Sequence, residues 1–399
     1  MLLAILLGSS GGCMRFECSS SDLSCSTSAA TALFGALQPC SVDYFGAIQT
    51  GRGPFYLATL QGQAALGAGG TPTVSSFASP ILATANKWLG GVLAPNGKIY
   101  GIPFDQNDIL VVDPTTDTAT TFASPVTGAA KWWGGVLAPN GKIYALPRDD
   151  DTILIIDPNT DTATTIASPI TGTAKWSGSI LAPNGKIYAI PRQSDSILVL
   201  DPDSNTATTI PSPIIGAGNK WVGGILAANG KIFGLPQAED VLLVIDPSTN
   251  TATTAAAPVS GTAKFAGGAL APNGKLYAIP QSDDNVLIID PDANTGSTFA
   301  PAIAGTNKWN GGVLAPDGKI YGIPREENDI LIIDSNTNTA TTLPSGEVSA
   351  TSKWTGGVLA PNGKIYGIPR DSDTILVIDP KTNGRFCDSI LLSGYMNKF

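Results

Sequence analysis

A lysine followed directly by an aromatic residue recurs at seven positions of this chain that are spaced 44 or 45 residues apart. The position 17 residues after each lysine holds Phe104, Gln237 or Gln281 in three copies and an arginine in the other four. Cations beside aromatic rings suit an anionic or sugar ligand. The candidate ligand-binding ring comprises Lys87, Trp88, Lys131, Trp132, Lys175, Trp176, Lys220, Trp221, Lys264, Phe265, Lys308, Trp309, Lys353, Trp354, Arg148, Arg192, Arg325 and Arg370.

A second interpretation of the same residues needs no ligand. In it the aromatic side chains pack one repeat against the next, and the lysines pair with neighbouring aspartates. The sequence alone leaves both interpretations open.

The sequence contains no histidine, which excludes Ser-His-Asp and Cys-His catalysis, histidine bases and most zinc sites. An enzyme places an acid, a base and a substrate pocket in unlike positions, whereas here the same residue types recur in nearly every copy. Departures such as Phe265 for Trp and Asp317 for Asn introduce no new reactive group. We therefore predict that the protein is not an enzyme and has no catalytic residue, cofactor or metal ion.

The charge pattern excludes one class of partner. The 32 acidic and 23 basic side chains give a net charge of −9 without any block of lysines or arginines, so nucleic acid is not an expected partner. Acidic loops at 149–151 and 282–284 lack the regular oxygen spacing of calcium loops, and we interpret them as solvated surface.

The N-terminal region differs from the rest of the chain. Its first seven residues are apolar but too few to span a membrane, and they fit a signal remnant or a buried segment equally well. Crowded cysteines in this region indicate disulfides, and hence an extracellular or cell-surface location. The candidates are Cys13, Cys18, Cys25 and Cys40, with Cys387 near the other end.

Each repeat predicts four short strands. In the copy that begins at Lys131, Gly-Gly-Val-Leu-Ala is followed by a Pro-Asn-Gly turn, Ile-Tyr-Ala-Leu-Pro, a polar loop, Ile-Leu-Ile-Ile-Asp and a threonine-rich segment. Seven such copies indicate an all-β, seven-bladed β-propeller with four-stranded blades. A stacked solenoid is the alternative, but it would need dissimilar capping repeats.

Closure of the ring is expected to use the N-terminal end of the repeats. Residues 71–77 resemble the fourth strand of a copy, whereas the last copy degenerates after Asp379-Pro380. The predicted organisation is an extension at 1–70, a propeller at 71–390 closed by a strand at 71–77, and a tail at 391–399.

Two recurring residue types have structural interpretations. Glycine pairs such as Gly90-Gly91 and Gly311-Gly312 indicate crowding where the inner strands converge. Aspartates that close the third strands are expected to hydrogen-bond to the following turn. They are Asp113, Asp157, Asp201, Asp246, Asp290, Asp334 and Asp379.

The segment 361–380, Pro-Asn-Gly-Lys-Ile-Tyr-Gly-Ile-Pro-Arg-Asp-Ser-Asp-Thr-Ile-Leu-Val-Ile-Asp-Pro, resembles the repeat of the NHL, YncE-like and virginiamycin-B-lyase-like propellers. This resemblance implies the propeller fold over about three quarters of the chain. It does not imply an activity, because these families include binding platforms as well as enzymes. The lyase resemblance implies a histidine-containing active site, and this chain has no histidine.

Three functions are consistent with these features. The uniform repeats favour a secreted structural scaffold that self-associates through the segment 1–70 into an oligomer or filament. A lectin-like propeller that holds glycans on the lysine–aromatic ring is the alternative. A lactonase-type or lyase-type enzyme is the least favoured.

Overall fold

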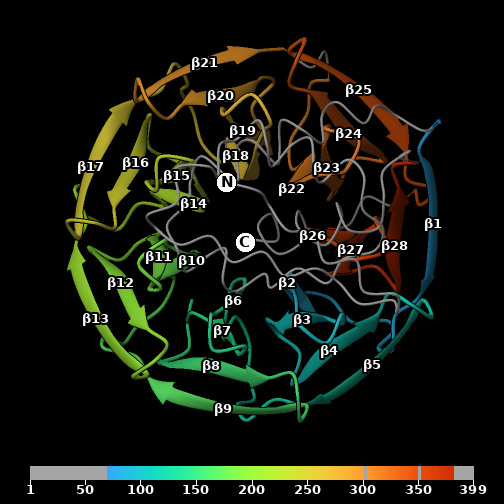
Figure 1. Ribbon diagram of the computed structural model, residues 1–399, viewed down its shortest axis with the longest axis horizontal. Coiled ribbons are helices and arrows are strands. Elements are labelled where there is room, and N and C mark those ends of the chain that lie inside the picture. The colour runs from blue at the N-terminus through green and yellow to red at the C-terminus, as the bar shows by residue number, and fades with distance from the viewer. Residues whose placement is uncertain (1–69, 301–302, 349–351, 382–399) are drawn as a thin grey trace, which may run out of the picture.

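The computed structural model describes residues 70–300, 303–348 and 352–381, and these residues form seven antiparallel sheets of four strands arranged in a ring (Figure 1). The expected all-β, seven-bladed propeller is therefore confirmed. Residues 1–69 of the predicted extension, the tail at 391–399 and all five candidate disulfide cysteines lie outside the described residues. The described part of the chain contains no helix long and apolar enough to cross a membrane.

Each blade contributes one strand to each of four concentric layers. The innermost strands are β2 (Trp88–Leu93), β6 (Val136–Leu137), β10 (Trp176–Leu181), β14 (Trp221–Leu226), β18 (Phe265–Leu270), β22 (Trp309–Leu314) and β26 (Trp354–Leu359). The second strands are β3 (Ile99–Pro103), β7 (Ile143–Ala145), β11 (Ile187–Pro191), β15 (Ile232–Pro236), β19 (Leu276–Pro280), β23 (Ile320–Pro324) and β27 (Ile365–Pro369).

The two outer layers complete the blades. The third strands are β4 (Asp108–Asp113), β8 (Thr152–Asp157), β12 (Ser196–Asp201), β16 (Val241–Asp246), β20 (Val286–Asp290), β24 (Asp329–Asp334) and β28 (Thr374–Asp379). The outermost strands are β5 (Thr118–Ala123), β9 (Thr162–Ala167), β13 (Thr206–Pro211), β17 (Thr251–Ala256), β21 (Thr295–Phe299), β25 (Thr339–Pro344) and β1 (Thr73–Ala78).

The ring is closed by a strand from each end of the repeat array. β1 pairs antiparallel with β28, in a register that joins Thr73 to Asp379 and Ala78 to Thr374. The last blade therefore has the strand order β1-β28-β27-β26. Closure of this kind leaves no blade with an unpaired third strand.

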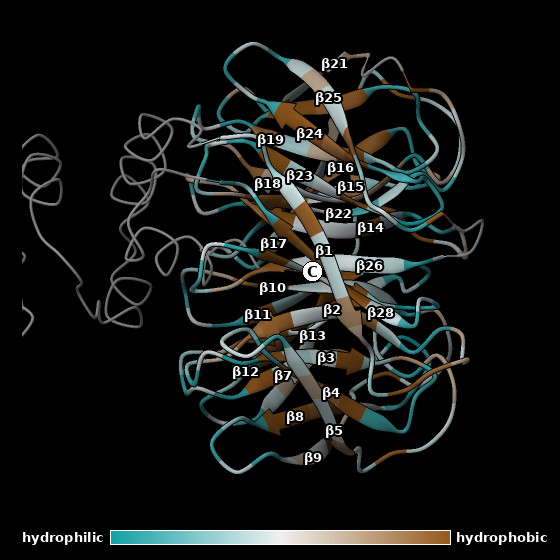
Figure 2. Ribbon diagram, turned by 90° about the vertical axis from the view of Figure 1, so that its right-hand side faces the viewer, coloured by the Kyte–Doolittle hydropathy of each residue, from teal (hydrophilic) through white to brown (hydrophobic). Residues whose placement is uncertain are grey.

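Burial explains the composition of each layer. The four central residues of the third strands are buried, in keeping with their continuous apolar runs. The outermost strands alternate between exposed and partly buried residues, which accounts for their threonines. The third strands are largely hydrophobic and the loops on both faces hydrophilic (Figure 2).

The aspartates that end the third strands act as predicted. In all seven blades the carboxylate accepts a hydrogen bond from the backbone N–H two residues later, as from Thr115 to Asp113 at 2.9 Å and from Asn159 to Asp157 at 3.0 Å. In the first six blades these bonds fix the turns that lead into the outermost strands.

A tyrosine and an asparagine tie five of the seven blades to the next, and in the fourth blade, where Phe233 replaces the tyrosine, Asn229 donates to the carbonyl of Pro291. Asn96 donates to the hydroxyl of Tyr100 at 2.9 Å and to the carbonyl of Pro158 at 2.8 Å, and Pro158 belongs to the outer turn of the following blade. Asn140 and Tyr144 repeat this arrangement with Pro202. The sixth blade differs because Asp317 replaces the asparagine, and it accepts a hydrogen bond from Tyr321 at 2.8 Å.

Replacement of Asp317 by asparagine is expected to stabilise the protein at neutral pH by about 1–2 kcal/mol, because a buried carboxylate would no longer lose its hydration. Burial raises the pKa of Asp317, so the folded state binds its proton more tightly than the unfolded state. The destabilisation by Asp317 therefore grows as the pH rises above about 4. Melting temperatures of Asp317→Asn and the parent chain should differ more at pH 7 than at pH 4.

The matched control for this substitution lies in the preceding blade. Asn273→Asp places a carboxylate beside the hydroxyl of Tyr277 and the carbonyl of Ser335. In the parent chain both oxygens accept a hydrogen bond from the Asn273 amide. This variant should be less stable at pH 7. Equal stability of all three chains at pH 7 would contradict the proposed cost of the buried carboxylate.

Candidate functional site

The seven lysine–aromatic pairs of the candidate ring are buried. Each lysine is at most 3% exposed, and the aromatic residues that follow are at most 1% exposed. Their side chains are thus not accessible to a ligand in this structure. They are Lys87, Trp88, Lys131, Trp132, Lys175, Trp176, Lys220, Trp221, Lys264, Phe265, Lys308, Trp309, Lys353 and Trp354.

These pairs hold the blades together instead. Lys131 donates from Nζ to the carbonyls of Phe104 at 3.0 Å and Gln106 at 2.7 Å, and Trp132 donates from Nε1 to the carbonyl of Thr152 at 2.8 Å. Five of the lysines also lie within 4.0 Å of an aspartate carboxylate, as expected for the packing interpretation. Burial lowers the pKa of Lys131, opposed by nearby aspartates. The structure therefore favours packing over ligand binding for these pairs.

A bulge in each innermost strand directs one side chain toward the axis. Pairing with the second strand shifts register between Trp88 and Gly91, and Gly90 has a positive φ of 76°. Glycine is required nearby for space as well, since a Cβ on Gly91 would lie 2.7 Å from Ile368 of the adjacent blade. A Cβ on Gly311 would lie 2.7 Å from Gly356, which confirms the predicted convergence of the inner strands.

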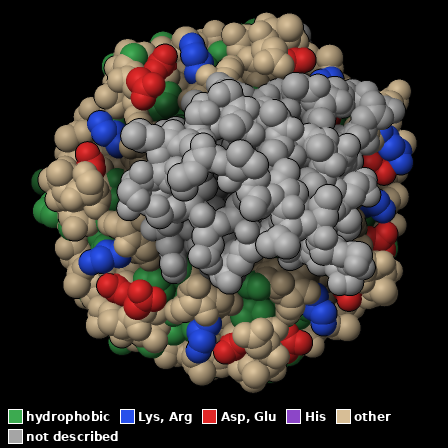
Figure 3. Space-filling model, viewed as in Figure 1, with side chains coloured by type: hydrophobic (Ala, Val, Ile, Leu, Met, Phe, Trp, Pro, Cys, Tyr) green, Lys and Arg blue, Asp and Glu red, His purple; other side chains and the backbone are tan. Residues whose placement is uncertain are grey.

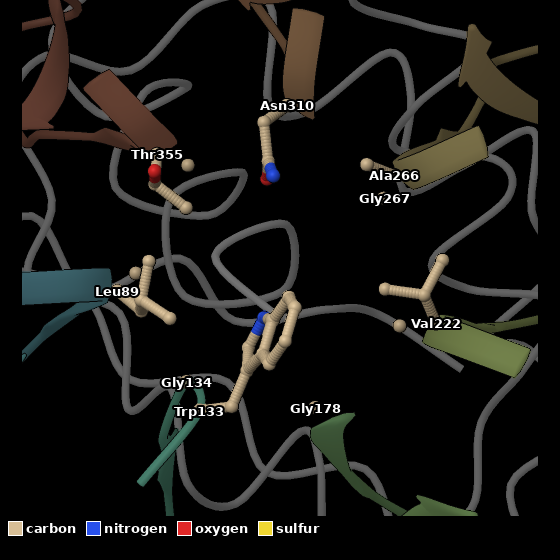
Figure 4. Close-up of a pocket in the computed structure, with 12 residues that line it drawn as sticks. Leu89, Trp133, Gly134, Gly178, Val222, Ala266, Gly267, Asn310 and Thr355 are labelled. Atoms are coloured by element: carbon tan, nitrogen blue, oxygen red, sulfur yellow. The ribbon is translucent and has the colours of Figure 1, made fainter. Parts of the chain in front are cut away.

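The bulge position lines the lumen of the ring. Leu89, Trp133, Val222, Ala266, Asn310 and Thr355 surround about 340 Å³ of space that includes solvent at its open end (Figure 4). The indole of Trp133 projects across this space. The enclosed part admits little more than one water molecule, so a larger ligand would sit at a mouth of the lumen.

Sequence variation between the repeats marks this lining. The residue directly after each lysine–aromatic pair is different in all seven copies, as Leu, Trp, Ser, Val, Ala, Asn and Thr. The repeat is thus uniform in its packing residues and varied at the one position that faces the lumen. Trp133 is the residue that sequence reasoning missed.

The four arginines of the candidate ring lie around one mouth of the lumen. Each directly follows the proline that ends a second strand, as do Phe104, Gln237 and Gln281. The guanidinium of Arg148 is 5.4 Å from the ring centroid of Phe104 and 5.8 Å from that of Trp133. Arg192 is 5.4 Å from the centroid of Trp133. We call these seven residues the mouth ring: Phe104, Arg148, Arg192, Gln237, Gln281, Arg325 and Arg370.

Three consecutive members of the mouth ring are anchored to the next blade. Gln281 donates to Asn307 Oδ1 at 3.0 Å, Arg325 donates from Nε to Ser352 Oγ at 3.0 Å, and Arg370 donates from Nη2 to Asn86 Oδ1 at 2.6 Å. Each acceptor directly precedes the lysine of its own blade. This anchored half is therefore held by side chains that recur at one position of the repeat.

The next three charged or polar members, Arg148, Arg192 and Gln237, form what we call the unanchored arc. The Nε atoms of both arginines and Oε1 of Gln237 are buried without a hydrogen-bond partner. Alanine replaces the anchor for two of them, at Ala174 and Ala263.

The acceptor that would anchor Arg192 is used by another residue. Asn219, which precedes the lysine of the blade after Arg192, accepts a hydrogen bond from Gln193 at 2.9 Å instead. Within the described residues, Arg192 makes no side-chain hydrogen bond or ion pair, whereas Arg148 pairs with Asp149 at 2.9 Å. Arg192 is thus a partly buried cation whose charge is not compensated by direct contact.

The electrostatics of the arc favour an anion. Burial and the neighbouring charge of Arg148 lower the pKa of Arg192, with Asp149 opposing them. Across the ring, burial and Arg370 lower the pKa of Arg325. A bound negative charge would relieve both the desolvation and the repulsion between like charges.

Backbone strain accompanies the missing anchors. Ala174 and Ala263 have φ values of 51° and 52°, close to the 53° of Asn307 in the anchored half. Asparagine tolerates this left-handed conformation better than alanine does. The arc is therefore kept open by residues that fit their backbone less well than the asparagine would.

The surface elsewhere carries mixed charge. On the face shown in Figure 3, basic and acidic side chains alternate around the rim without a block of one sign. Within residues 70–300, 303–348 and 352–381, no group of three or more acidic or cysteine side chains is placed to hold a metal ion.

Comparison with known proteins was made for sequence and for structure. No family profile and no curated protein sequence matches the chain. A streptogramin B lyase structure matches with a TM-score of 0.67 and 15% identity, covering 78% of this chain and 98% of that one. The chain is a seven-bladed β-propeller that resembles the virginiamycin-B-lyase-like repeat proteins.

The other structural matches of this propeller include a second lyase, an extracellular domain and another enzyme. A catalytically inactive virginiamycin B lyase from Staphylococcus aureus with quinupristin matches at 14% identity and a TM-score of 0.67, covering 77% of this chain and 99% of that one. The extracellular domain of a hybrid two-component system from B. thetaiotaomicron matches at 11% identity and 0.60, covering 78% and 43%. Hydrazine synthase from Kuenenia stuttgartiensis matches at 13% identity and 0.59, covering 75% and 97%. Identities this low establish the fold alone.

Proposed function

We propose that this protein is a non-enzymatic, extracellular scaffold: a rigid β-propeller disc that self-associates through its segment 1–70. The observation that carries the proposal is that the side chains recurring in the seven repeats are consumed by contacts within the disc. The lysines cap loop carbonyls, the tryptophans and tyrosines bond between strands and blades, and the aspartates fix turns. Groups used in this way contribute rigidity rather than chemistry.

The groups left unpaired also support a non-enzymatic role. In the mouth ring these are guanidinium Nε atoms and an amide oxygen, which bind ligands but do not exchange protons near neutral pH. The nearby carboxylates are engaged: Asp149 accepts from the backbone N–H of Ala174 at 2.6 Å, and Asp105 from that of Ala130 at 2.8 Å.

The extracellular location and the assembly rest on other support. Four of the five cysteines lie within the first 40 residues, as in disulfide-linked extracellular segments. Two structural neighbours are described as extracellular domains. If the segment 1–70, which we call the arm, docks on a neighbouring disc without closing a ring, the assembly is a filament.

Negative-stain electron microscopy of the full chain tests this function directly. Filaments or regular arrays of discs are expected, because the arm links one disc to the next. A chain that begins at residue 70 and lacks the arm should give separate discs. Isolated discs from the full chain would overturn the assembly.

The lectin-like and enzymatic alternatives have less support. A glycan site on the lysine–aromatic pairs would need side chains that are buried in the disc. A lyase or lactonase site would need a histidine or a set of metal-binding carboxylates, and neither is among the described residues. Glycan recognition would therefore have to use other residues.

A further inference from the structure

We propose that the unanchored arc, together with Trp133, is a binding site for a sugar acid: one pyranose ring that carries a carboxylate and hydroxyl groups. The site lies at the mouth of the lumen between the second, third and fourth blades. It is independent of the scaffold function, which concerns the disc as a whole.

The carboxylate is expected to bind the two arginines. Arg148 and Arg192 both lie beside the indole of Trp133, with guanidinium-to-centroid distances of 5.8 and 5.4 Å, and they are close enough to each other that, in addition to burial, the charge of Arg148 lowers the pKa of Arg192. Only Arg148 has a carboxylate partner within hydrogen-bond distance. A planar carboxylate matches the paired N–H groups of a guanidinium.

Gln237 is the reason for proposing hydroxyl groups in the ligand. This side chain is 9% exposed, and its Oε1 atom is buried without a donor. A ligand must therefore supply an N–H or O–H group to satisfy it. An ammonium group is disfavoured beside two guanidinium ions, which leaves a neutral donor, and the hydroxyl groups of a sugar are of this kind.

Trp133 is the reason for proposing a pyranose ring in the ligand. It is the aromatic residue among those that line the lumen, and it is partly exposed, unlike the buried Trp132 that precedes it. The flat face of an indole stacks on the C–H groups of a pyranose. The enclosed part of the lumen holds little more than one water molecule, so the sugar ring would lie at the open mouth, beside the partly exposed indole.

Calorimetric titration of the full chain with galacturonate and glucuronate tests the proposal, with galactose and sulfate as comparison probes. At least one uronate should bind, and galactose and sulfate should each bind at least about tenfold more weakly, since each lacks part of the recognised group. Equal affinity for sulfate would reduce the site to a simple anion site. Equal affinity for galactose would show that the arginines do not contribute to binding, because galactose has no carboxylate. Either result, or no uronate binding, overturns the proposal.

Oligogalacturonates distinguish a free sugar acid from the end of an acidic polysaccharide. If the site takes a chain end, an oligomer should bind at least as tightly as the monomer, with one oligomer per disc. If it takes only the free acid, the oligomer should bind more weakly. Both results agree with a sugar-acid site, and filament formation in the microscope remains a separate result.

Substitutions borrowed from other blades locate the site. Arg192→Gln introduces the residue that the next blade has at this position, Gln237, and Trp133→Leu introduces the residue of the first blade, Leu89. Each substitution should weaken uronate binding by roughly tenfold or more. Arg325→Gln makes the same exchange in the anchored half and should leave the affinity unchanged. Equal losses in the two halves would contradict the assignment to the arc.

Ala263→Asn provides a variant that keeps every binding side chain. It gives Gln237 the asparagine acceptor that Asn307 provides for Gln281 in the next blade, and it relieves a left-handed alanine, so the melting temperature should rise. Anchoring Gln237 should at the same time weaken uronate binding. A more stable variant with unchanged uronate affinity would exclude Gln237 from the site.

Discussion

Trp309→Ala is expected to lower the free energy of unfolding by about 3–5 kcal/mol. Trp309 is fully buried, and its Nε1 donates to the carbonyl of Asp329 at 2.7 Å. The substitution leaves a large cavity beside the neighbouring blade and an unpaired carbonyl. A loss of this size is a large fraction of the stability of most domains, and denaturant unfolding measures it.

The fifth blade provides the control for this prediction. Phe265 replaces the tryptophan there and is also fully buried. Trp309→Phe should therefore lose mainly the indole hydrogen bond and part of the packing, at a cost of about 1–2 kcal/mol. If alanine and phenylalanine destabilised the protein equally, the packing role of the aromatic side chain would be refuted.

Removal of β1 should have the second large effect. A chain that begins at residue 79 lacks the strand that pairs with β28 from Thr73 through Ala78. It also lacks Phe77, whose ring lies 6.4 Å from that of Tyr366 and packs on the core of the last blade. We expect this chain to lose its cooperative unfolding transition and to aggregate, because a six-residue strand edge is exposed.

The chain that begins at residue 70 is the matched control, because it retains β1. The two chains differ by nine residues, so thermal unfolding and size-exclusion chromatography can be compared directly. Similar melting curves and monomeric elution for both would show that the closing strand is dispensable.

The fold was predictable because each layer of a blade carries its own local pattern. The Asn-Gly or Asp-Gly turns, the apolar third strands and their terminal aspartates recur seven times, and repetition makes a weak local signal strong. The Asx bonds of all seven aspartates follow from local sequence alone. Such short-range features need no tertiary information.

The binding residues were less predictable for a physical reason. A lysine beside a tryptophan has the same local sequence whether it faces solvent or caps loop carbonyls, and only the packing of blades decides that Lys308 is buried. The unpaired atoms of Arg192 and Gln237 depend on side chains of the following blades, about 26 residues away. Variation at the position of Trp133 could have indicated the lumen, since a uniform repeat varies where packing does not constrain it.

The bulge in the innermost strands separates what holds the disc together from what faces its axis. In six of the seven repeats the lysine and the aromatic residue are buried between blades, whereas the side chain that follows them lines the lumen; in the third blade Ser177 donates to the carbonyl of Trp221 instead. That side chain is exchangeable in a way its neighbours are not, as its seven identities in one chain demonstrate. Six axial positions therefore sit on a constant frame, and their side chains can be exchanged one at a time without altering the contacts that hold the blades together.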